Sequence, residues 1–142
     1  MTQLWCNKYI GTPWREFGRA ADGCDCWGLA CLVYRNELGI ELPSYAGAYT
    51  SAEERREIAA LIGGATRSPL WHAAPGRPEE FDVAVFRRGQ FASHVGIVVR
   101  PGLMLHMSGE DCAKLEDYRQ PLWRTRLTGI WRHETRVEGV VK

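Results

Sequence analysis

The first part of the chain shows the residue spacing of helices. Residues 2–10 fit one short helix, which the GTP run at 11–13 ends. A longer helix is predicted to begin after Asp25, a good N-cap residue, and to end at Gly39, a typical residue just past the last turn. Its opening stretch, CWGLACLV, is apolar on almost every side. A helix of this kind is buried, so we expect it at the centre of the fold.

A second helix is predicted over 51–64, SAEERREIAALIGG. Ser51 can cap it, and acidic residues in its first turn suit the helix dipole. Its apolar positions form a narrow stripe, which is typical of a helix on the surface: Ile58, Leu61 and Ile62. Residues 65–80 contain three prolines and are expected to form a long loop.

After residue 80 the pattern changes to that of strands. Four short apolar or β-branched runs are separated by turn-forming or charged segments: FDVAVF (81–86), HVGIVV (94–99), LMLHMS (103–108) and LTGIWRHE (127–134). Helices followed by a run of strands predict an α+β fold with a separate antiparallel sheet. The length of 142 residues and the hydrophobic content of 45% suit a single domain over 1–142.

Composition excludes several classes of function. Lys and Arg number 18 against 17 Asp and Glu, so no general attraction to nucleic acid or to anionic membranes is expected. The longest apolar stretch, 27–34, is too short to cross a bilayer, so we expect no membrane insertion. The first residues lack a secretory signal pattern, which predicts synthesis in the cytoplasm without a signal peptide. No C-x-x-C pair occurs, and the C-x-C at Cys24 and Cys26 lacks a second half at zinc-finger spacing, so we expect no structural zinc site.

Cys26 differs from the other four cysteines in its position. It starts the predicted central helix, where backbone N–H groups and the positive end of the helix dipole stabilise a thiolate. Cys6 and Cys31 fit small buried side chains, Cys24 is intermediate, and Cys112 lies in a charged loop. Most single cysteines only pack, so position alone leaves both interpretations of Cys26 open.

A thiolate nucleophile needs a base and a group that orients the base. His94 opens one predicted strand and His106 lies in the next. The other two histidines fit better as solvated or locally paired side chains (His72 and His133). A strict two-residue turn between the strands would put His94 and His106 on opposite faces of the sheet. A catalytic pair therefore requires an odd-length loop or a bulge around 100–103.

Four motifs together resemble those of a known family. GTPW at 11–14, DCWGL at 25–29, SHVGIVV at 93–99 and LMLH at 103–106 are similar, in order and distance, to the NlpC family of papain-like cell-wall cysteine peptidases. The resemblance covers about 10–132. It implies a papain-like fold with N-terminal helices packed on an antiparallel sheet. It also implies hydrolysis of peptide bonds in peptidoglycan stems, typically between D-γ-glutamyl and a diamino acid, with no cofactor.

The resemblance also implies the roles of individual residues. Cys26 would be the nucleophile, His94 its base, and His106 the residue that orients the base. Four further residues are expected on the substrate side: Trp14, Asp25, Trp27 and Ser93.

Each of these four substrate-side residues has a second interpretation. Trp14 replaces the usual tyrosine of the family and Trp27 its usual serine, so both can reshape the cleft. Asp25 could be only an N-cap, and Ser93 only a residue at the strand edge.

The tryptophan of DCWGL, with VYRNELGIELPSY (33–45) after it, resembles the branch found in tails of phages and gene transfer agents. This implies peptidoglycan and tail-particle proteins as partners, with incorporation in a tail or virion and action at the cell wall. One alternative is a structural tail connector that keeps the fold with little or no activity. A weaker alternative is a thiol redox protein using Cys24 and Cys26, although no thioredoxin-like βαβ pattern supports it.

Overall fold

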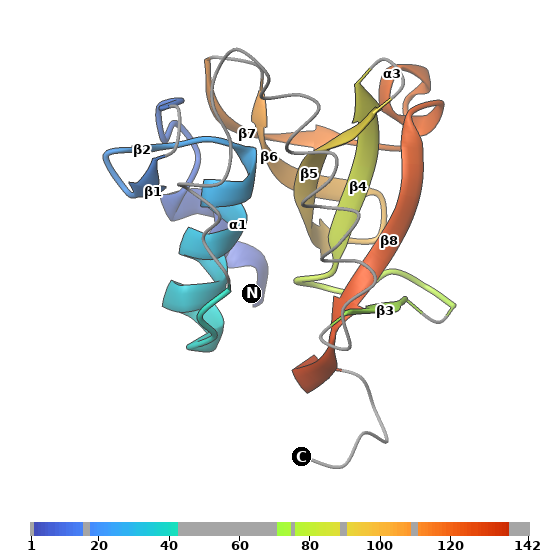
Figure 1. Cartoon of the computed structure of the whole chain (residues 1–142), viewed down its shortest axis with the longest axis horizontal. Coiled ribbons are helices and arrows are strands. Elements are labelled where there is room, and N and C mark those ends of the chain that lie inside the picture. The colour runs from blue at the N-terminus through green and yellow to red at the C-terminus, as the bar shows by residue number, and fades with distance from the viewer. Residues whose placement is uncertain are drawn as a thin grey trace.

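A six-stranded antiparallel sheet lies beside one central helix (Figure 1). This computed structural model describes residues 2–15, 18–42, 71–74, 76–88, 91–108 and 111–136. The strand order is β3-β8-β4-β5-β6-β7. The strands are Trp71–Ala73 (β3), Val83–Arg88 (β4), Phe91–Arg100 (β5), Leu103–Ser108 (β6), Cys112–Asp117 (β7) and Leu127–His133 (β8).

The helices and a small second sheet precede and flank this large sheet. A 3-10 helix, η1, begins the described chain, and a two-stranded sheet of β1 and β2 leads into the central helix α1. The chain then continues as one π-helical segment, η2. Their bounds, with those of the later short helices, are Thr2–Lys8 (η1), Arg19–Ala20 (β1), Gly23–Cys24 (β2), Cys26–Val33 (α1), Tyr34–Leu38 (η2), Pro121–Arg124 (α3) and Glu134–Arg136 (η3).

The predicted α+β class is confirmed, as are both ends of the central helix. The carboxylate of Asp25 accepts a hydrogen bond of 2.8 Å from the Gly28 N–H, which is the N-cap geometry. Gly39 has a φ of 67°, the left-handed conformation that glycine adopts most easily after a helix. Every residue of α1 is buried, as its apolar circumference predicted.

Two strands and one hairpin were not predicted. β3 lies within the region expected to be a loop, and β7 lies in a segment that looked merely charged. In β7 only Ala113 is buried, so the edge strand has no strong alternation to detect. The β1–β2 hairpin at 19–24 had no predicted counterpart. The predicted helix over 51–64 lies outside the described residues, as does 65–70 of the predicted loop.

The sheet separates two apolar clusters. The larger one contains α1 with residues of alternate sheet positions, among them Val83, Val85, Val95, Ile97 and Leu105. The smaller one lies on the alternate positions of the same strands: Ala84, Phe86, Val98 and Met104, with Tyr118 and Trp123. α1 packs against β5 and β6, and also against β1 and β2. The central strands are therefore buried on both faces.

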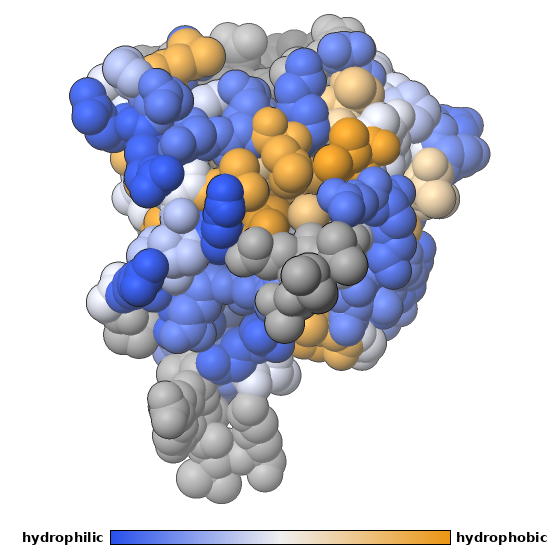
Figure 2. All heavy atoms as spheres, turned by 180° about the vertical axis from the view of Figure 1, so that it is seen from behind, coloured by the Kyte–Doolittle hydropathy of each residue, from blue (hydrophilic) through white to orange (hydrophobic). Residues whose placement is uncertain are grey.

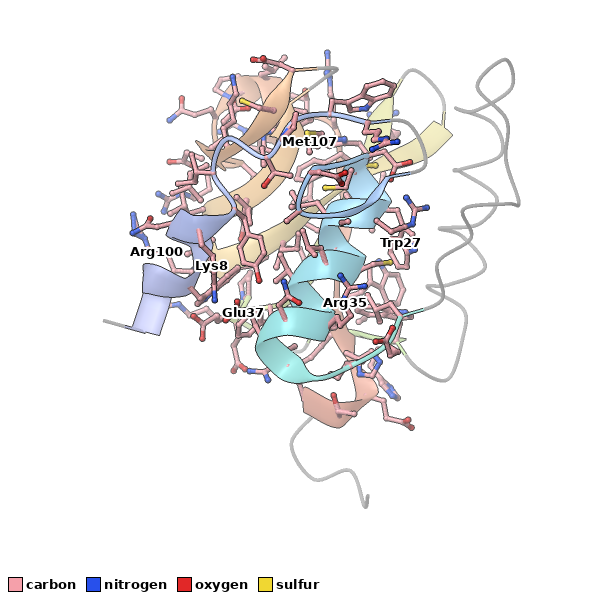
Figure 3. All side chains as sticks on the ribbon, turned by 90° about the vertical axis from the view of Figure 1, so that its left-hand side faces the viewer. Lys8, Trp27, Arg35, Glu37, Arg100 and Met107 are labelled. Atoms are coloured by element: carbon pink, nitrogen blue, oxygen red, sulfur yellow. The ribbon has the colours of Figure 1, made fainter. Side chains whose placement is uncertain are left out.

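Polar side chains border the apolar surface of the molecule. Seen from behind, apolar side chains gather at the middle of the face and hydrophilic ones surround them (Figure 2). On an adjacent side of the molecule, Figure 3 shows η1 beside α1 and η2, where Lys8 faces Glu37. Their ion pair measures 2.8 Å, and the Tyr9 hydroxyl donates to the same carboxylate at 2.6 Å. These bonds attach the N-terminal segment to the end of the central helix.

A buried ion pair joins the start of β4 to β8. The Arg132 guanidinium donates through Nε and Nη2 to the two carboxylate oxygens of Asp82, each at 2.8 Å. Both side chains are almost fully buried, at 6% and 1% exposure. Two parallel charge-assisted bonds of this kind are strong, and removing one partner leaves an uncompensated buried charge.

We expect Asp82→Ala to lower the free energy of unfolding by about 3–5 kcal/mol, because it leaves the Arg132 guanidinium buried without its counter-charge. Asp22→Ala is the matched control, since its ion pair with Arg15 is exposed at both ends, and it should cost less than about 1 kcal/mol. Urea unfolding followed by circular dichroism measures both values. Equal effects of the two substitutions would contradict this assignment.

Candidate active site

Cys26 is the first residue of α1, and its position is fixed by the capping residue before it. Asp25 accepts from the Gly28 N–H and also from Arg19 Nη1, at 2.9 Å. The Asp25 side chain is therefore the N-cap, and only 2% of the residue is exposed. Cys26 itself is 6% exposed. As the first residue of α1, Cys26 lies at the positive end of the helix dipole, which favours a thiolate.

Three of the remaining cysteines lie in surroundings that disfavour the thiolate. All five cysteines lie in the described part of the chain, and each is a reduced thiol. Burial raises the pKa of Cys24 and of Cys31 to about 12, and it raises the pKa of Cys6 as well. Since the thiolate is the nucleophile, these three thiols are poor reagents near neutral pH. Cys24 and Cys26 are both free cysteines in this structure.

His94 and His106 lie side by side in the interior of the sheet. His94 Nε2 and His106 Nδ1 are 2.9 Å apart, and both residues are completely buried. The register between β5 and β6 shifts between Val98 and Arg100. This shift places Gly96 opposite His106, so that His94, two residues from Gly96, lies on the same face. The bulge that the catalytic interpretation required is thus present where it was expected.

Gly96 leaves the space that this pair needs. A Cβ atom added there would lie 2.5 Å from the Met104 sulfur and 3.3 Å from the His106 Cβ. The first distance is shorter than contacts that Cβ atoms make. A side chain at this position would therefore displace Met104 and press on His106.

Two residues that the sequence analysis missed complete the cluster. Glu116 of β7 contacts His106 Nε2 through Oε1 at 2.7 Å. The Trp123 indole N–H donates to the other oxygen, Oε2, at 3.2 Å. The Trp123 ring also stacks on His94, with centroids 5.2 Å apart and 21° between planes, and meets His106 edge-on at 5.0 Å. β7 and α3 gave no sequence signal that pointed to this cluster.

Cys26 approaches the same two strands from the helix. α1 packs against β5 and β6, and Cys26 shares an apolar cluster with Val95 of β5. The His94 ring contacts Phe86 and Trp123. The described contacts thus join two of the three predicted catalytic residues directly. Cys26 stays the predicted nucleophile because of its place at the start of α1.

The predicted substrate-side residues have different surroundings. Trp14 is half-buried and forms a β-bridge with Cys24. Trp27 is only 5% exposed and belongs to the apolar core; in Figure 3 it lies on the other side of α1 from Lys8. Ser93 is part of β5, and its side chain lies outside the described part of the structure.

The other two histidines lie outside this cluster, as expected of solvated or locally paired side chains. His133 Nδ1 lies 2.9 Å from the Thr135 hydroxyl, and burial lowers its pKa. His72 is exposed on β3. Within the described ranges, no three His, Cys, Asp or Glu side chains converge as metal ligands would. Among the described helices, none has the length and apolar composition of a membrane span.

Comparison with known sequences identifies relatives. The sequence model of the NlpC/P60 family matches residues 11–132. Murein DD-endopeptidase MepS/Murein LD-carboxypeptidase of Escherichia coli K12 is 27% identical over 116 residues, which are 82% of this chain and 53% of that protein. Gamma-DL-glutamyl hydrolase of Bacillus subtilis is 28% identical over 131 residues, which are 90% of this chain and 28% of the relative. The chain therefore spans about half or less of these curated relatives.

Solved structures show the same fold. An NLP/P60 family protein similar to lipoprotein, from Staphylococcus aureus, superposes with a TM-score of 0.65 at 22% identity, covering 92% of this chain and 40% of that one. An NlpC/P60 family protein from Bacillus cereus gives 0.66 at 18% identity, over 93% and 39%. The NlpC/p60 domain of the peptidoglycan hydrolase SagA gives 0.59 at 18% identity, over 92% and 94%.

We expect iodoacetamide at neutral pH to alkylate Cys26 before the other cysteines, because the helix start stabilises its thiolate whereas burial holds Cys24 and Cys31 as thiols. Peptide mass spectrometry at increasing reaction times measures the order. In denaturant all five cysteines should react at similar rates. Earlier labelling of Cys24 or Cys112 in the folded protein would contradict the assignment of Cys26 as the reactive thiol.

Proposed function

We propose that this chain, which belongs to the NlpC/P60 family, is a cysteine peptidase that cleaves the stem peptides of peptidoglycan. The observation that carries the proposal is the buried His94–His106 hydrogen bond on the two strands against which the Cys26 helix packs. A nucleophile at a helix start, a base and an orienting residue are the parts that acyl transfer requires.

The proposed reaction begins at the ring nitrogen of His94 that does not face His106. This atom, Nδ1, takes the proton of the Cys26 thiol, and the thiolate attacks the carbonyl carbon of the scissile bond. Backbone N–H groups at the start of α1 stabilise the oxyanion that forms. His94 then gives its proton to the departing amine, which leaves a thioester on Cys26. A water molecule, deprotonated by His94, attacks the thioester and releases the acid product and the thiol.

The proposed bond joins D-γ-glutamate to the diamino acid of the stem. One relative is named for murein peptide cleavage and another for hydrolysis of γ-DL-glutamyl bonds. Both names describe amide bonds in polymers containing D-residues, and this supports the same class of substrate here. Four residues are proposed to lie on the substrate side: Trp14 and Asp25, which lie beside the start of α1, and Trp27 and Ser93. For this reaction, the carbonyl carbon of the D-γ-glutamyl residue has to reach the Cys26 sulfur.

The site of action is proposed from the tryptophan of DCWGL and the segment 33–45. Their resemblance to the branch in phage and gene-transfer-agent tails supports a tail component that opens the cell wall, with other particle proteins as partners. The alternative, a tail connector with little or no activity, is favoured by one observation. Trp27 is buried in the core where the family usually has serine, and in a connector this side chain would serve packing alone.

Digestion of purified peptidoglycan tests the enzyme against the connector. The protein should release fragments cut after D-γ-glutamate, identified by mass spectrometry of the muropeptides. Cys26→Ser removes the thiol and should abolish release. His94→Ala removes the base and should lower kcat at least about a thousandfold while the fold persists.

A second measurement on these variants tests the pairing of thiol and base without any substrate. If His94 takes the Cys26 proton, His94→Ala should slow alkylation of Cys26 at neutral pH. Unchanged alkylation would contradict the pairing. An intact, folded protein that releases no fragments from peptidoglycan would favour the connector.

His106 should tolerate only side chains that accept a hydrogen bond from His94. His106→Asn keeps an acceptor in its amide oxygen and should retain a measurable fraction of activity, whereas His106→Leu should lose much more. A residue that only packs would show the reverse order, because leucine suits an apolar sheet face better. The variants are compared at matched thermal melts. If leucine retains more activity than asparagine, Cys26 and His94 act without a third member.

A further inference from the structure

We propose that Glu116 is a positioning residue that sets the tautomers of both His106 and His94. The inference rests on the proposed function, because it concerns how His94 is prepared to act as a base. Glu116 lies on β7, outside the motifs by which the sequence pointed to a peptidase. Its carboxylate lies 2.7 Å from His106 Nε2, and 34% of the Glu116 side chain is exposed to water.

The hydrogen bonds form a sequence in which each donor determines the next. An ionised carboxylate only accepts hydrogen bonds, so His106 Nε2 must carry its proton toward Glu116. In a neutral imidazole the second nitrogen then accepts, so His106 Nδ1 accepts from His94 Nε2 across 2.9 Å. His94 therefore keeps its proton on Nε2. Its Nδ1 is left with the lone pair that a general base needs.

The opposite arrangement would disable the base. If His106 carried its proton on Nδ1, His94 Nε2 would have to accept it. The neutral His94 ring would then carry its own proton on Nδ1, where the thiol proton should go. Both rings are fully buried, so water does not readily replace either bond. The direction of the whole sequence is thus decided at its exposed end, by Glu116.

Trp123 holds the carboxylate in the orientation that this role requires. Its indole N–H donates to Oε2 of Glu116, which leaves Oε1 for His106. The same ring stacks on His94 and contacts His106 with its edge. One rigid side chain therefore fixes the carboxylate and both imidazole planes together. This arrangement is more than a surface ion pair, whose partners move in water.

A second tryptophan–glutamate hydrogen bond in the described structure provides a matched control. Trp5 Nε1 donates to Oε2 of Glu80 at 2.6 Å, and the Trp5 ring stacks on Phe81 with centroids 4.6 Å apart. This indole–carboxylate bond has the same chemistry but does not touch His94 or His106. Substitutions at Glu80 therefore control for the loss of such a bond without any change in the histidines.

Three substitutions at Glu116 distinguish the effects of a hydrogen-bond acceptor, of the negative charge and of a hydrogen-bond donor at this position. Glu116→Gln keeps an acceptor, Glu116→Leu has none, and Glu116→Lys has only donors. Selective 15N labelling of histidine followed by NMR reports which ring nitrogen carries the proton. We expect both rings protonated at Nε2 in the parent and in Glu116→Gln. We expect mixed tautomers in Glu116→Leu and protonation at Nδ1 in Glu116→Lys.

Activity on peptidoglycan should follow the tautomers. Glu116→Gln should lose only a few-fold in kcat, and Glu116→Leu about 10–100-fold, as removal of outer-shell partners typically does. Glu116→Lys should lose the most, toward the roughly 10⁴-fold loss that a wrong tautomer causes in serine proteases. KM should change little in all three. Glu80→Leu should leave both the NMR signals and kcat unchanged.

The two proposals fail in different ways. If the histidine signals of Glu116→Leu and Glu116→Lys match those of the parent, Glu116 does not set the tautomers and this inference is overturned. If the signals change as expected while the parent protein cleaves no peptidoglycan, the tautomer assignment stands and the peptidase function fails. Should Glu116→Lys not fold, Glu116→Leu and Glu116→Gln still decide the question.

Discussion

A one-residue shift in register between β5 and β6 is the constraint on which the proposed chemistry depends. The shift lies between Val98 and Arg100, and it decides which face of the sheet His106 occupies. Without it, a tight turn would place His94 and His106 on opposite faces, and neither their hydrogen bond nor the contact with Glu116 could form. The bulge is thus a local feature of the backbone, but it determines which face His106 shares with His94 several residues away.

Burial makes this geometry stable as well as specific. A polar ring moved into the protein interior without a hydrogen bond costs free energy of the order of 1–3 kcal/mol. His94 and His106 are completely buried, so each needs a partner on its ring nitrogens. Their mutual bond satisfies one nitrogen of each, and Glu116 satisfies the outer nitrogen of His106. Stability and orientation therefore favour the same arrangement, and Trp123 covers it with an aromatic face.

The parts that could be predicted from sequence are those set by local chemistry. Asp25 and Gly39 mark the ends of the central helix because capping depends on the residue at the cap itself. The register could not be predicted, since β5 is buried on both faces from His94 to Val99 and its apolar run carries no alternation that selects one pairing. β7 was missed for a related reason, because an edge strand with one buried residue resembles a charged loop. Glu116 was missed with it.

The helix and the sheet contribute different things to the proposed site. The helix dipole at Cys26 depends only on the start of α1, so a short motif with its capping aspartate makes Cys26 a candidate nucleophile. The base is instead defined by contacts between β5, β6, β7 and α3, which lie together only in the folded chain. A motif therefore points to the proposed nucleophile more readily than to the protonation state of the proposed base. In the proposed arrangement, Glu116 at the surface decides which ring nitrogen of His94 carries the proton, because its effect reaches His94 through the hydrogen bonds of His106. The tautomer of His94 therefore depends on contacts across several strands.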